Sequence, residues 1–182
     1  MQRDRDNAHN QQTVSGWVRN WSGYIPSASA ILDLACGSGR HSRYLAGLGH
    51  RVLAVDRDVE ALAALAGTAG IETRVADLEN AAWPLGERRF GAVVVTNYLH
   101  RPLFPRIVAA IAGNGVLIYE TFAAGNERFG KPSNPDFLLR PGELLDVVAG
   151  KFRVIAYEEL QIGEPKPAMV QRICAMRFDA GP

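Results

Sequence analysis

Three aspartates stand at the ends of successive apolar runs, and the first run leads into a glycine-rich turn. Asp33 lies within the run 31–35, and Asp56 and Asp77 close the next two runs. Ionised carboxylates accept hydrogen bonds from hydroxyl and amino groups of a ligand. An acid at the end of the second run suits the two hydroxyls of a ribose. The spacing therefore predicts a binding site for a ligand that contains a nucleoside.

The turn after the first run reads Ala35-Cys36-Gly37-Ser38-Gly39-Arg40. Glycines allow a sharp bend and a close approach of a ligand because they carry no Cβ. Residues 40–48 continue at helical spacing, and the start of a helix presents free N–H groups. Such a turn at the carboxyl end of a strand is where open α/β sheets bind ligands. The alternative is an ordinary α/β turn in which Asp33 only helps to form the bend.

Two details separate this turn from a dinucleotide-binding turn. Dinucleotide folds usually keep the first strand apolar and place a third glycine three residues after the second. Here the strand contains Asp33, which is costly to bury unless something uses it, and Ser42 stands where the third glycine would be. With these details, the stretch Leu32-Asp33-Leu34-Ala35-Cys36-Gly37-Ser38-Gly39 closely resembles the first motif of the class I S-adenosylmethionine (SAM)-dependent methyltransferases.

This resemblance implies where each part of SAM would lie. The amino-acid part would lie by the glycine turn, the ribose hydroxyls would donate to Asp56, and the adenine would meet Asp77 and Leu78. A purely turn-capping role is the alternative for Asp77. The predicted cofactor-binding residues are Asp33, Ala35, Gly37, Gly39, Asp56, Arg57, Asp77, Leu78 and Asn97.

The segment 97–101 follows the fourth apolar run and faces the methyl group in the resembled fold. It lacks the Asn/Asp-Pro-Pro-aromatic signature of amino-methylating DNA enzymes, which argues against methylation of bases. His100 is the predicted general base, because the pKa of a free imidazole lies near neutrality. Tyr98 is the second predicted catalytic residue, placed to line the pocket. For both residues, a role in capping or packing is the alternative. Methyl transfer needs mainly alignment and a dry pocket, so no obligatory catalytic motif is expected.

A stretch without periodicity, 122–140, follows the predicted fifth strand. Structureless loops of this length are often lids or binding loops. Glu120, Arg128 and Arg140 are the predicted substrate contacts, because a cationic lid suits a small anionic substrate. A solvated loop is the alternative. The resemblance, which extends from about residue 30 onward, implies a small-molecule acceptor of the thiol, oxyanion or carboxylate type.

Length and composition fit one α/β domain. The chain has 182 residues, 47% of them hydrophobic, and a net charge of +1, and it has no basic stripe that would predict a nucleic-acid partner. We expect a flexible N-terminus over residues 1–12 and the domain over 13–182. The polar N-terminus and the lack of a long apolar run predict neither a secretory signal nor a membrane span. Two cysteines favour a reducing cytoplasmic location, and no cluster of metal ligands is visible. The oligomeric state is left open.

Alternating strand and helix patterns predict a Rossmann-like sheet of seven mostly parallel strands with helices on both faces. The link 163–167 is too short for a crossover helix, so the last strand is expected to run antiparallel. Helices are predicted over 14–21, 40–48, 58–67, 102–112 and 141–150. The first of them carries Trp17 and Trp21, which we expect to pack on the sheet or, alternatively, to cover the ligand.

Two other functions stay open at this point. The first is an NAD-binding oxidoreductase, which would require a third glycine and a final parallel crossover. The second is a methyltransferase-like fold that binds or regulates without catalysis, which the sequence does not distinguish from an enzyme.

Overall fold

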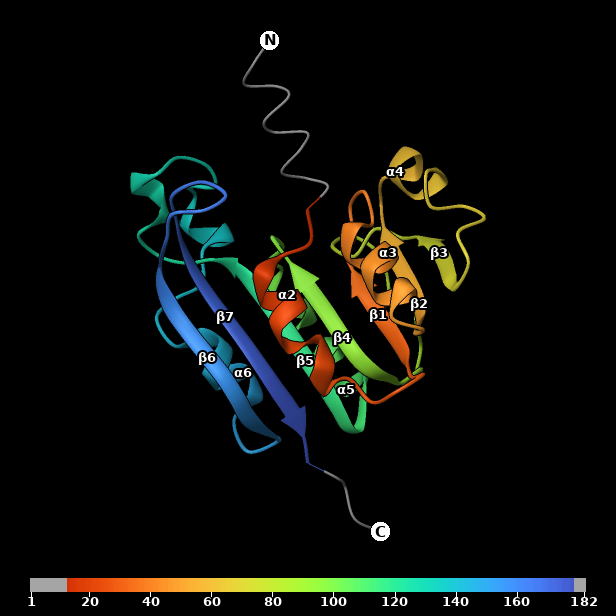
Figure 1. Ribbon diagram of the computed structural model, residues 1–182. Coiled ribbons are helices and arrows are strands. Elements are labelled where there is room, and N and C mark those ends of the chain that lie inside the picture. Colours follow the sequence, from red (N-terminus) through yellow and green to blue (C-terminus); the bar gives the residue numbers. More distant parts are fainter. Residues whose placement is uncertain (1–12, 179–182) are drawn as a thin grey trace.

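Seven strands form one sheet in the computed structural model, which describes residues 13–178 (Figure 1). The strands are β1 (Ala30–Leu34), β2 (Arg51–Asp56), β3 (Ile71–Val75), β4 (Phe90–Thr96), β5 (Ile111–Phe122), β6 (Phe152–Ile162) and β7 (Ala168–Arg177). Their order across the sheet is β3-β2-β1-β4-β5-β7-β6. Strands β1 to β5 pair in parallel, and β7 runs antiparallel to both β5 and β6. The predicted fold class, with its antiparallel last strand, is confirmed.

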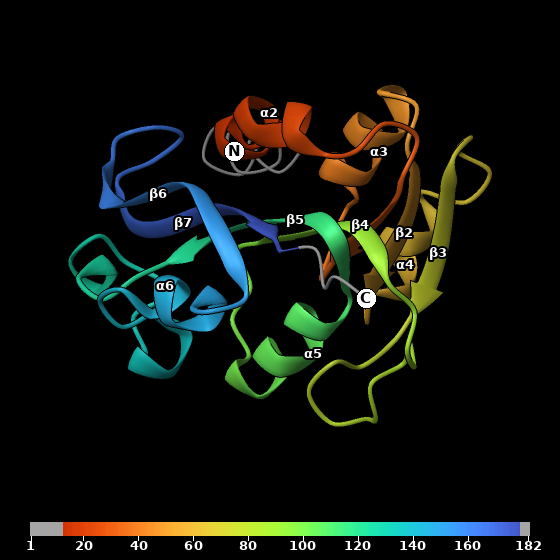
Figure 2. The same cartoon turned by 90° about the horizontal axis from the view of Figure 1, so that it is seen from below.

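Helices cover both faces of this sheet. They are α2 (Gly16–Trp21), α3 (Arg40–Gly47), α4 (Val59–Ala63), α5 (Phe104–Ala109) and α6 (Glu143–Val148). Four short 3₁₀ turns accompany them, η1 (Ser22–Tyr24), η2 (Arg101–Leu103), η3 (Asn126–Arg128) and η4 (Pro135–Phe137). Figure 2 shows α2 and α3 on one face and α5 and α6 on the other. The predicted flexible segment 1–12 lies outside the described residues.

Three predicted helices are shorter in the structure than in the sequence analysis. The helix expected over 58–67 ends at Ala63, although Asp58 caps its start by accepting a hydrogen bond from the amide of Ala61. The alanine-rich segment beyond it forms turns that lead to Gly67, whose φ of +78° does not continue a helix. The helix expected over 102–112 begins as the turn η2 and ends at Ala109, and that expected over 141–150 spans only α6. Periodicity located these helices and overestimated their lengths.

Most of the core forms two apolar layers, one on each face of the sheet, and a small third cluster includes Cys36, Leu62 and Leu65. Alternate residues of a strand point to opposite faces, so Ile31 and Val52 enter one layer and Leu32 and Leu53 enter the other. Strand β4 lies at the centre of the sheet, and its residues 92–95 are all buried. An all-apolar central strand was expected there, and the structure confirms it.

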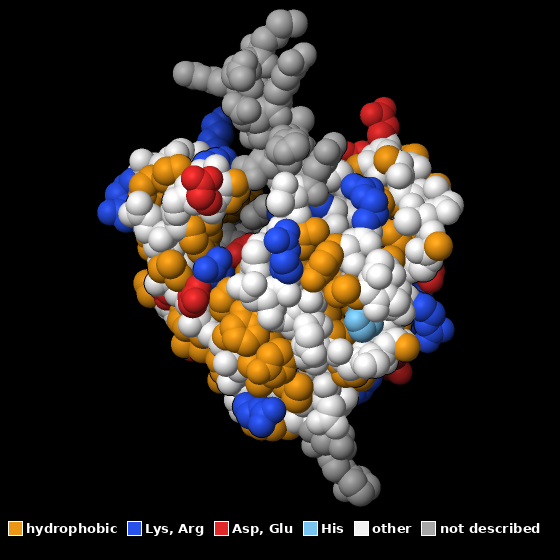
Figure 3. Space-filling view, in the orientation of Figure 1, with side chains coloured by type: hydrophobic (Ala, Val, Ile, Leu, Met, Phe, Trp, Pro, Cys, Tyr) orange, Lys and Arg blue, Asp and Glu red, His pale blue; other side chains and the backbone are white. Residues whose placement is uncertain are grey.

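Helix α2 belongs to the first layer and packs on the sheet. Trp17 is 3% exposed, and its indole Nε1 donates a 3.2 Å hydrogen bond to the carbonyl of Ile173 in β7. The partly buried side chains of Trp21, Ile155 and Met176 pack against the same layer. Figure 3 shows hydrophobic side chains gathered on this face over the lower part of α2 and the adjoining strands. Packing on the sheet is therefore the confirmed role of these tryptophans.

Candidate active site

The glycine turn between β1 and α3 has a different requirement at each glycine. Gly39 adopts a φ of +72°, and a Cβ at this position would collide with the side chain of Leu65. Gly37 adopts a φ of +54°, and a Cβ there would meet nothing within 4 Å. Gly39 is therefore required by the protein's own packing. Gly37 instead faces open space, where a ligand can approach the backbone.

Asp56, at the end of β2, holds this turn in place. Its Oδ2 accepts a 2.7 Å hydrogen bond from the amide of Gly37, and its Oδ1 accepts a 3.0 Å hydrogen bond from the amide of Asp58. A carboxylate offers about four lone-pair sites, so Asp56 keeps capacity for further donors. Two residues predicted to bind the same ligand, Asp56 and Gly37, are thus in direct contact.

Asp77 caps the turn that follows β3. Its Oδ1 accepts hydrogen bonds from the amides of Glu79 (2.9 Å) and Asn80 (3.1 Å), and its Oδ2 accepts one from the side chain of Asn80. These hydrogen bonds hold the pKa of Asp77 below its ordinary value. The capping role that was the alternative for Asp77 is present, and the same residue also borders a cavity.

A cavity of about 170 Å³ opens at the carboxyl ends of β1 to β4. Its lining consists of Ala35, Asp56, Arg57, Ala76, Asp77, Leu78, Glu79 and Tyr98. The sequence analysis named all of these as site residues except Ala76 and Glu79. Both flank the predicted pair Asp77-Leu78, so the end of β3 was itself the signal for them. Four predicted cofactor residues, Asp33, Gly37, Gly39 and Asn97, do not line this cavity.

Tyr98 contributes a neutral phenol to the cavity. Its hydroxyl is buried and makes no hydrogen bond among the residues the structure describes. Burial, and secondarily the nearby Glu79 carboxylate, raise the pKa of Tyr98 above its ordinary value. Because the phenol stays protonated at neutral pH, it is suited to donate a hydrogen bond and is not suited to act as a base.

Asp33 lies behind the turn, with only 1% of its surface exposed. Its Oδ2 accepts a 2.6 Å hydrogen bond from the hydroxyl of Ser42. Burial raises the pKa of Asp33 to about 6. Ser42, which stands where a dinucleotide fold has its third glycine, therefore serves as the partner of the buried acid.

The loop after β4 carries Asn97 and His100. Asn97 is exposed, has a φ of +54°, and donates a backbone hydrogen bond of 2.9 Å to the carbonyl of Glu120. His100 is half-buried, and its carbonyl accepts from the amide of Leu103 at the start of the following helical segment. Its imidazole does not line the cavity and has no hydrogen-bond partner within residues 13–178.

His41, in the first turn of α3, is a buried residue that the sequence indicated only as a secondary candidate for contacting the ligand. It is 1% exposed, and its Nε2 accepts a 3.2 Å hydrogen bond from the amide of Ser15. An amide N–H can only donate, so Nε2 is unprotonated and Nδ1 carries the proton that goes to Thr96 Oγ1, 3.3 Å away. Burial, and then the charge of Arg40, lower the pKa of His41 to about 3. The imidazole is therefore neutral at physiological pH.

Glu120, predicted to contact the substrate, joins the N-terminal segment to the sheet. Its Oε1 accepts a 2.7 Å hydrogen bond from the hydroxyl of Ser15, and its Oε2 accepts one of 3.1 Å from Arg172 in β7. The guanidinium of Arg172 also pairs with Glu158 and lies 4.7 Å from the ring centroid of Trp17. Arg172 was not predicted, because nothing local in β7 indicates that its partners lie on two other strands.

The loop 122–140 is tied to its surroundings through Glu143, which is 3% exposed. Arg101 donates two hydrogen bonds to this carboxylate, from Nε to Oε1 (2.7 Å) and from Nη2 to Oε2 (2.9 Å). The same guanidinium donates to the carbonyls of Asp136 and Leu138. Neither Arg101 nor Glu143 was predicted, because the contact joins the loop after β4 to the start of α6.

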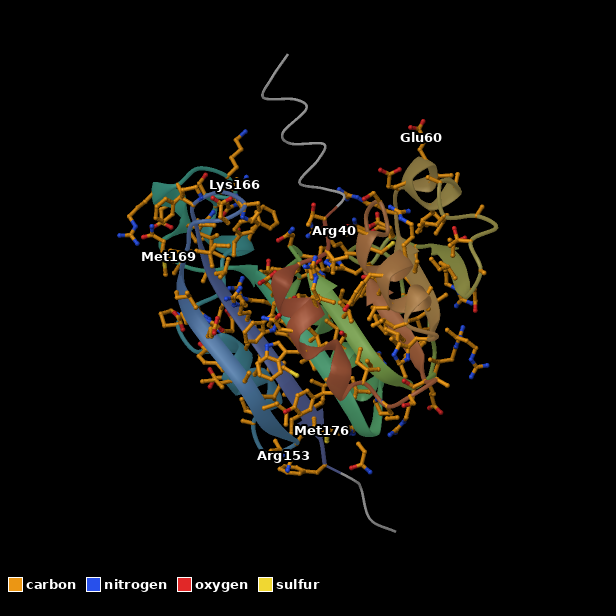
Figure 4. The ribbon with its side chains drawn as sticks, in the orientation of Figure 1. Arg40, Glu60, Arg153, Lys166, Met169 and Met176 are labelled. Carbon is orange, nitrogen blue, oxygen red and sulfur yellow. The ribbon has the colours of Figure 1, made fainter. Side chains whose placement is uncertain are left out.

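Of the two arginines predicted on this loop, Arg128 has a contact within it and Arg140 contacts the first residue of α6. Arg128 Nε donates to the carbonyl of Gly125 at 3.1 Å. Arg140 Nη2 donates to Glu143 at 3.2 Å, and its side chain is 75% exposed. Figure 4 shows Arg40, Glu60 and Lys166 on the side of the sheet where the parallel strands have their carboxyl ends. Arg153 and Met176 lie at the opposite ends of the strands. The strand bounds place the predicted site residues at the carboxyl ends of β1 to β5, where some line the cavity and others lie on the side of the loop 122–140.

Comparison with protein families identifies the part of the chain that forms this cavity. Residues 31–113, from β1 into the start of β5, match the family described as "Methyltransferase domain". The matched residues include the glycine turn, Asp56 and Asp77, and they make up somewhat less than half of the chain. This match agrees with the resemblance that the glycine turn carries. A comparison with curated proteins finds no match.

Several solved structures share the fold of this chain. TehB from Haemophilus influenzae superposes with a TM-score of 0.74 at 20% identity, covering 90% of this chain and 62% of TehB. The chain therefore spans less than two thirds of the length of TehB. A TehB-like SAM-dependent methyltransferase from Corynebacterium glutamicum gives a TM-score of 0.68 at 23% identity, covering 97% of this chain and 95% of the other.

A third structure contains two bound ligands. It is the 1,6-didemethyltoxoflavin-N1-methyltransferase from Burkholderia thailandensis, with 1,6-didemethyltoxoflavin and S-adenosylhomocysteine (SAH). Its TM-score is 0.69 at 18% identity, and the match covers 98% of this chain and 84% of that one. At these identities the likenesses show the fold.

No helix within residues 13–178 is long and apolar enough to cross a membrane. No group of three or more His, Cys, Asp and Glu residues in the same range is arranged to hold a metal ion.

Proposed function

We propose that this methyltransferase transfers the methyl group of SAM to a small-molecule acceptor by in-line displacement. The observation that carries the proposal is the cavity at the ends of β1 to β4, bordered by both Asp56 and Asp77. A nucleoside needs acceptors for its ribose hydroxyls and for an adenine amino group, and these two carboxylates provide them. A cavity of about 170 Å³ suits the adenosine half of the cofactor better than the whole of it.

Each end of the cofactor then has its own set of residues. Asp56 accepts from the ribose with the lone pairs that Gly37 and Asp58 leave unused, and Asp77, Leu78 and Arg57 surround the adenine. The amino-acid end passes along the turn from Ala35 to Gly39. The open space beside Gly37 is what such a close approach requires. Asp33 places a buried acid beneath this turn, and Asn97 borders it from β4.

The residues of this chain contribute alignment and exclusion of water more than they contribute chemistry. SAM supplies a methyl group already activated on a sulfonium. Holding two reactants in line can remove about 7–11 kcal/mol of a barrier. His100 is the proposed base for an acceptor that must lose a proton, since its imidazole has no internal partner among residues 13–178. Tyr98, with its neutral phenol in the cavity, acts in positioning.

The acceptor is proposed to bind on the side of the loop 122–140. Two structural neighbours act on compounds outside the nucleic acids: the Burkholderia enzyme holds 1,6-didemethyltoxoflavin, and MtfA is a glycopeptide N-methyltransferase. For this chain we propose a thiol, oxyanion or small carboxylate, with Glu120, Arg128 and Arg140 on the acceptor side. The exposed guanidinium of Arg140 can form bidentate hydrogen bonds with an anion. The free thiols of Cys36 and Cys174 support a reducing, cytoplasmic setting.

A methyl-transfer assay tests this function. Purified protein is incubated with SAM carrying a labelled methyl group and a panel of thiols, oxyanions and small carboxylates. Label is expected to appear in one of these classes, and His100→Ala is expected to slow the transfer while SAM affinity stays within twofold. SAM binding without transfer to any member of the panel would favour a non-catalytic binding subunit. Binding of NAD in place of SAM would overturn the proposal.

A further inference from the structure

The segment that precedes α2 is bonded across the edge of the sheet that carries the site. Its hydrogen bonds include one from Arg40 Nη1 to the carbonyl of Thr13 (3.1 Å), one from the amide of Ser15 to His41 Nε2 (3.2 Å), and one from the hydroxyl of Ser15 to Glu120 (2.7 Å). Arg40 and His41 belong to the first turn of α3, and Glu120 lies near the end of β5. We call residues 13–15 the N-terminal latch.

The latch and the cavity occupy different parts of this edge. The cavity is lined by the ends of β1 to β4 and includes Asp77 beyond β3. The latch is anchored at the start of α3, at Glu120 of β5 and, through His41, at Thr96 of β4. A ligand that fills the cavity with its adenosine half and extends along the turn 35–39 therefore reaches the latch with its opposite end.

We propose that the N-terminal latch closes over the amino-acid end of bound SAM, and that His41 is the positioning residue that holds it closed. This inference rests on the proposed function, since it requires SAM at this edge. The latch then limits how quickly the cofactor enters and its product SAH leaves. Residues 13–15 must release their bonds to α3 before the ligand can be exchanged.

The geometry explains why a neutral histidine is suited to this position. Its Nε2 must accept from the Ser15 amide while its Nδ1–H donates to Thr96, and an imidazolium, with two donors, cannot do both. The hydroxyl of Ser15 also caps α2 by accepting from the amides of Trp17 and Val18. Helix α2 stays packed through Trp17, so the proposed opening involves the latch, residues 13–15, and leaves α2 in place.

Rates of SAH binding test the latch without any knowledge of the acceptor. Stopped-flow association and dissociation of SAH are measured for the wild type, His41→Leu, His41→Gln and His50→Leu. We expect His41→Leu to raise the dissociation rate at least tenfold and to raise the association rate as well. Gln offers an acceptor near the position of Nε2, so His41→Gln is expected to return both rates to within threefold of wild type.

His50 provides the matched control. It is also a buried histidine, 7% exposed, but it precedes β2 at the amino end of that strand. His50→Leu is expected to leave both rates within twofold of wild type. If His41→Leu does not fold, Thr96→Val removes only the hydroxyl that receives the Nδ1–H of His41, and it is expected to raise the dissociation rate at least threefold.

Failure of the proposed function and failure of the latch give different results in this experiment. If the wild type does not bind SAH, the proposed function fails. If the wild type binds SAH and folded His41→Leu exchanges it at the wild-type rate within twofold, the latch is refuted while the proposed function stands. Thr96→Val, read in the same way, decides the question when His41→Leu is unfolded.

Discussion

The carboxylate of Asp56 accepts a hydrogen bond of 2.7 Å from the backbone amide of Gly37. This contact ties the end of β2 to the turn after β1, so one acid both shapes the glycine turn and borders the cavity. The two parts of the proposed cofactor site are therefore coupled, and a change at Asp56 is expected to affect the affinity for SAM more than the stability of the fold.

Asp56→Ala is expected to weaken SAM binding about 10- to 100-fold, which corresponds to roughly 1–3 kcal/mol for a lost charged hydrogen-bond partner. Isothermal titration calorimetry measures the change. Asp58→Ala is the matched control, because Asp58 is exposed and caps α4. It should cost about 1 kcal/mol of stability and leave SAM affinity unchanged. Equal loss of affinity in both variants would contradict the assigned role of Asp56.

The two glycines of the turn are expected to respond differently to alanine. Gly39→Ala introduces a Cβ against Leu65 and is expected to destabilise the fold by about 2 kcal/mol or more. Gly37→Ala meets no protein atom, so it is expected to cost about 1 kcal/mol for its positive φ and to lose SAM affinity instead. Urea unfolding and calorimetry on both variants separate the effects. A Gly37→Ala protein with wild-type affinity would show that the open space is not used by the ligand.

At the carboxyl ends of β1 to β3, the residues that border the cavity could be predicted because their signals in the sequence are local. The acids at 56 and 77 directly follow the apolar runs that form β2 and β3, and parallel strands bring their carboxyl ends to one edge. Turn chemistry and residue type could therefore be read without knowledge of long-range contacts. The same reasoning named most of the residues that line the cavity.

The other side of the site was not predictable in the same way. Ser15 and Glu120 contact each other across 105 positions, and Arg101 and Glu143 across 42. Periodicity reports which face of an element is apolar but not which polar side chains meet across the fold. Alanine-rich segments such as 61–66 also favour a helix locally, and tertiary structure ended that helix early.

Asp33→Asn is expected to change how stability depends on pH. Burial raises the pKa of Asp33 from 3.8 to about 6 in the folded state. The folded protein therefore binds this proton more tightly than the unfolded chain does. The contribution of Asp33 to the free energy of unfolding is fully present below pH 3.8 and is lost as pH rises through 6. Asn keeps an acceptor for Ser42 without the charge. Relative to wild type, the variant should gain up to about 3 kcal/mol between pH 4 and pH 7 in urea unfolding. A difference that does not vary with pH would contradict this.

His41→Gln is expected to act in the opposite direction. The pKa of His41 falls from 6.5 to about 3 on folding, so its contribution to stability is present above pH 6.5 and is lost as pH falls toward 3. Gln does not titrate. The free energy of unfolding of the His41→Gln variant should therefore decline less than that of wild type between pH 6.5 and 4. The difference between the two declines should be at most about 1.4 kcal/mol per pH unit. Parallel stability curves for the two proteins would refute the neutral, buried state of His41.

Glu143→Leu is expected to destabilise the protein by about 3–5 kcal/mol, because it leaves the guanidinium of Arg101 without its buried carboxylate partner. Urea unfolding gives the total effect, and hydrogen exchange should show faster exchange across residues 122–140. Arg140→Lys is the control: this side chain is 75% exposed, so the change should remain within about 0.5 kcal/mol. Similar losses in the two variants would show that the loop does not depend on the Arg101–Glu143 pair.

The most direct test of the central claim is a crystal structure of the protein with SAH. The ribose hydroxyls are expected within hydrogen-bond distance of the Asp56 carboxylate, with the adenine beside Asp77 and Leu78. A nucleoside bound elsewhere, or one whose ribose makes no contact with Asp56, would contradict the account.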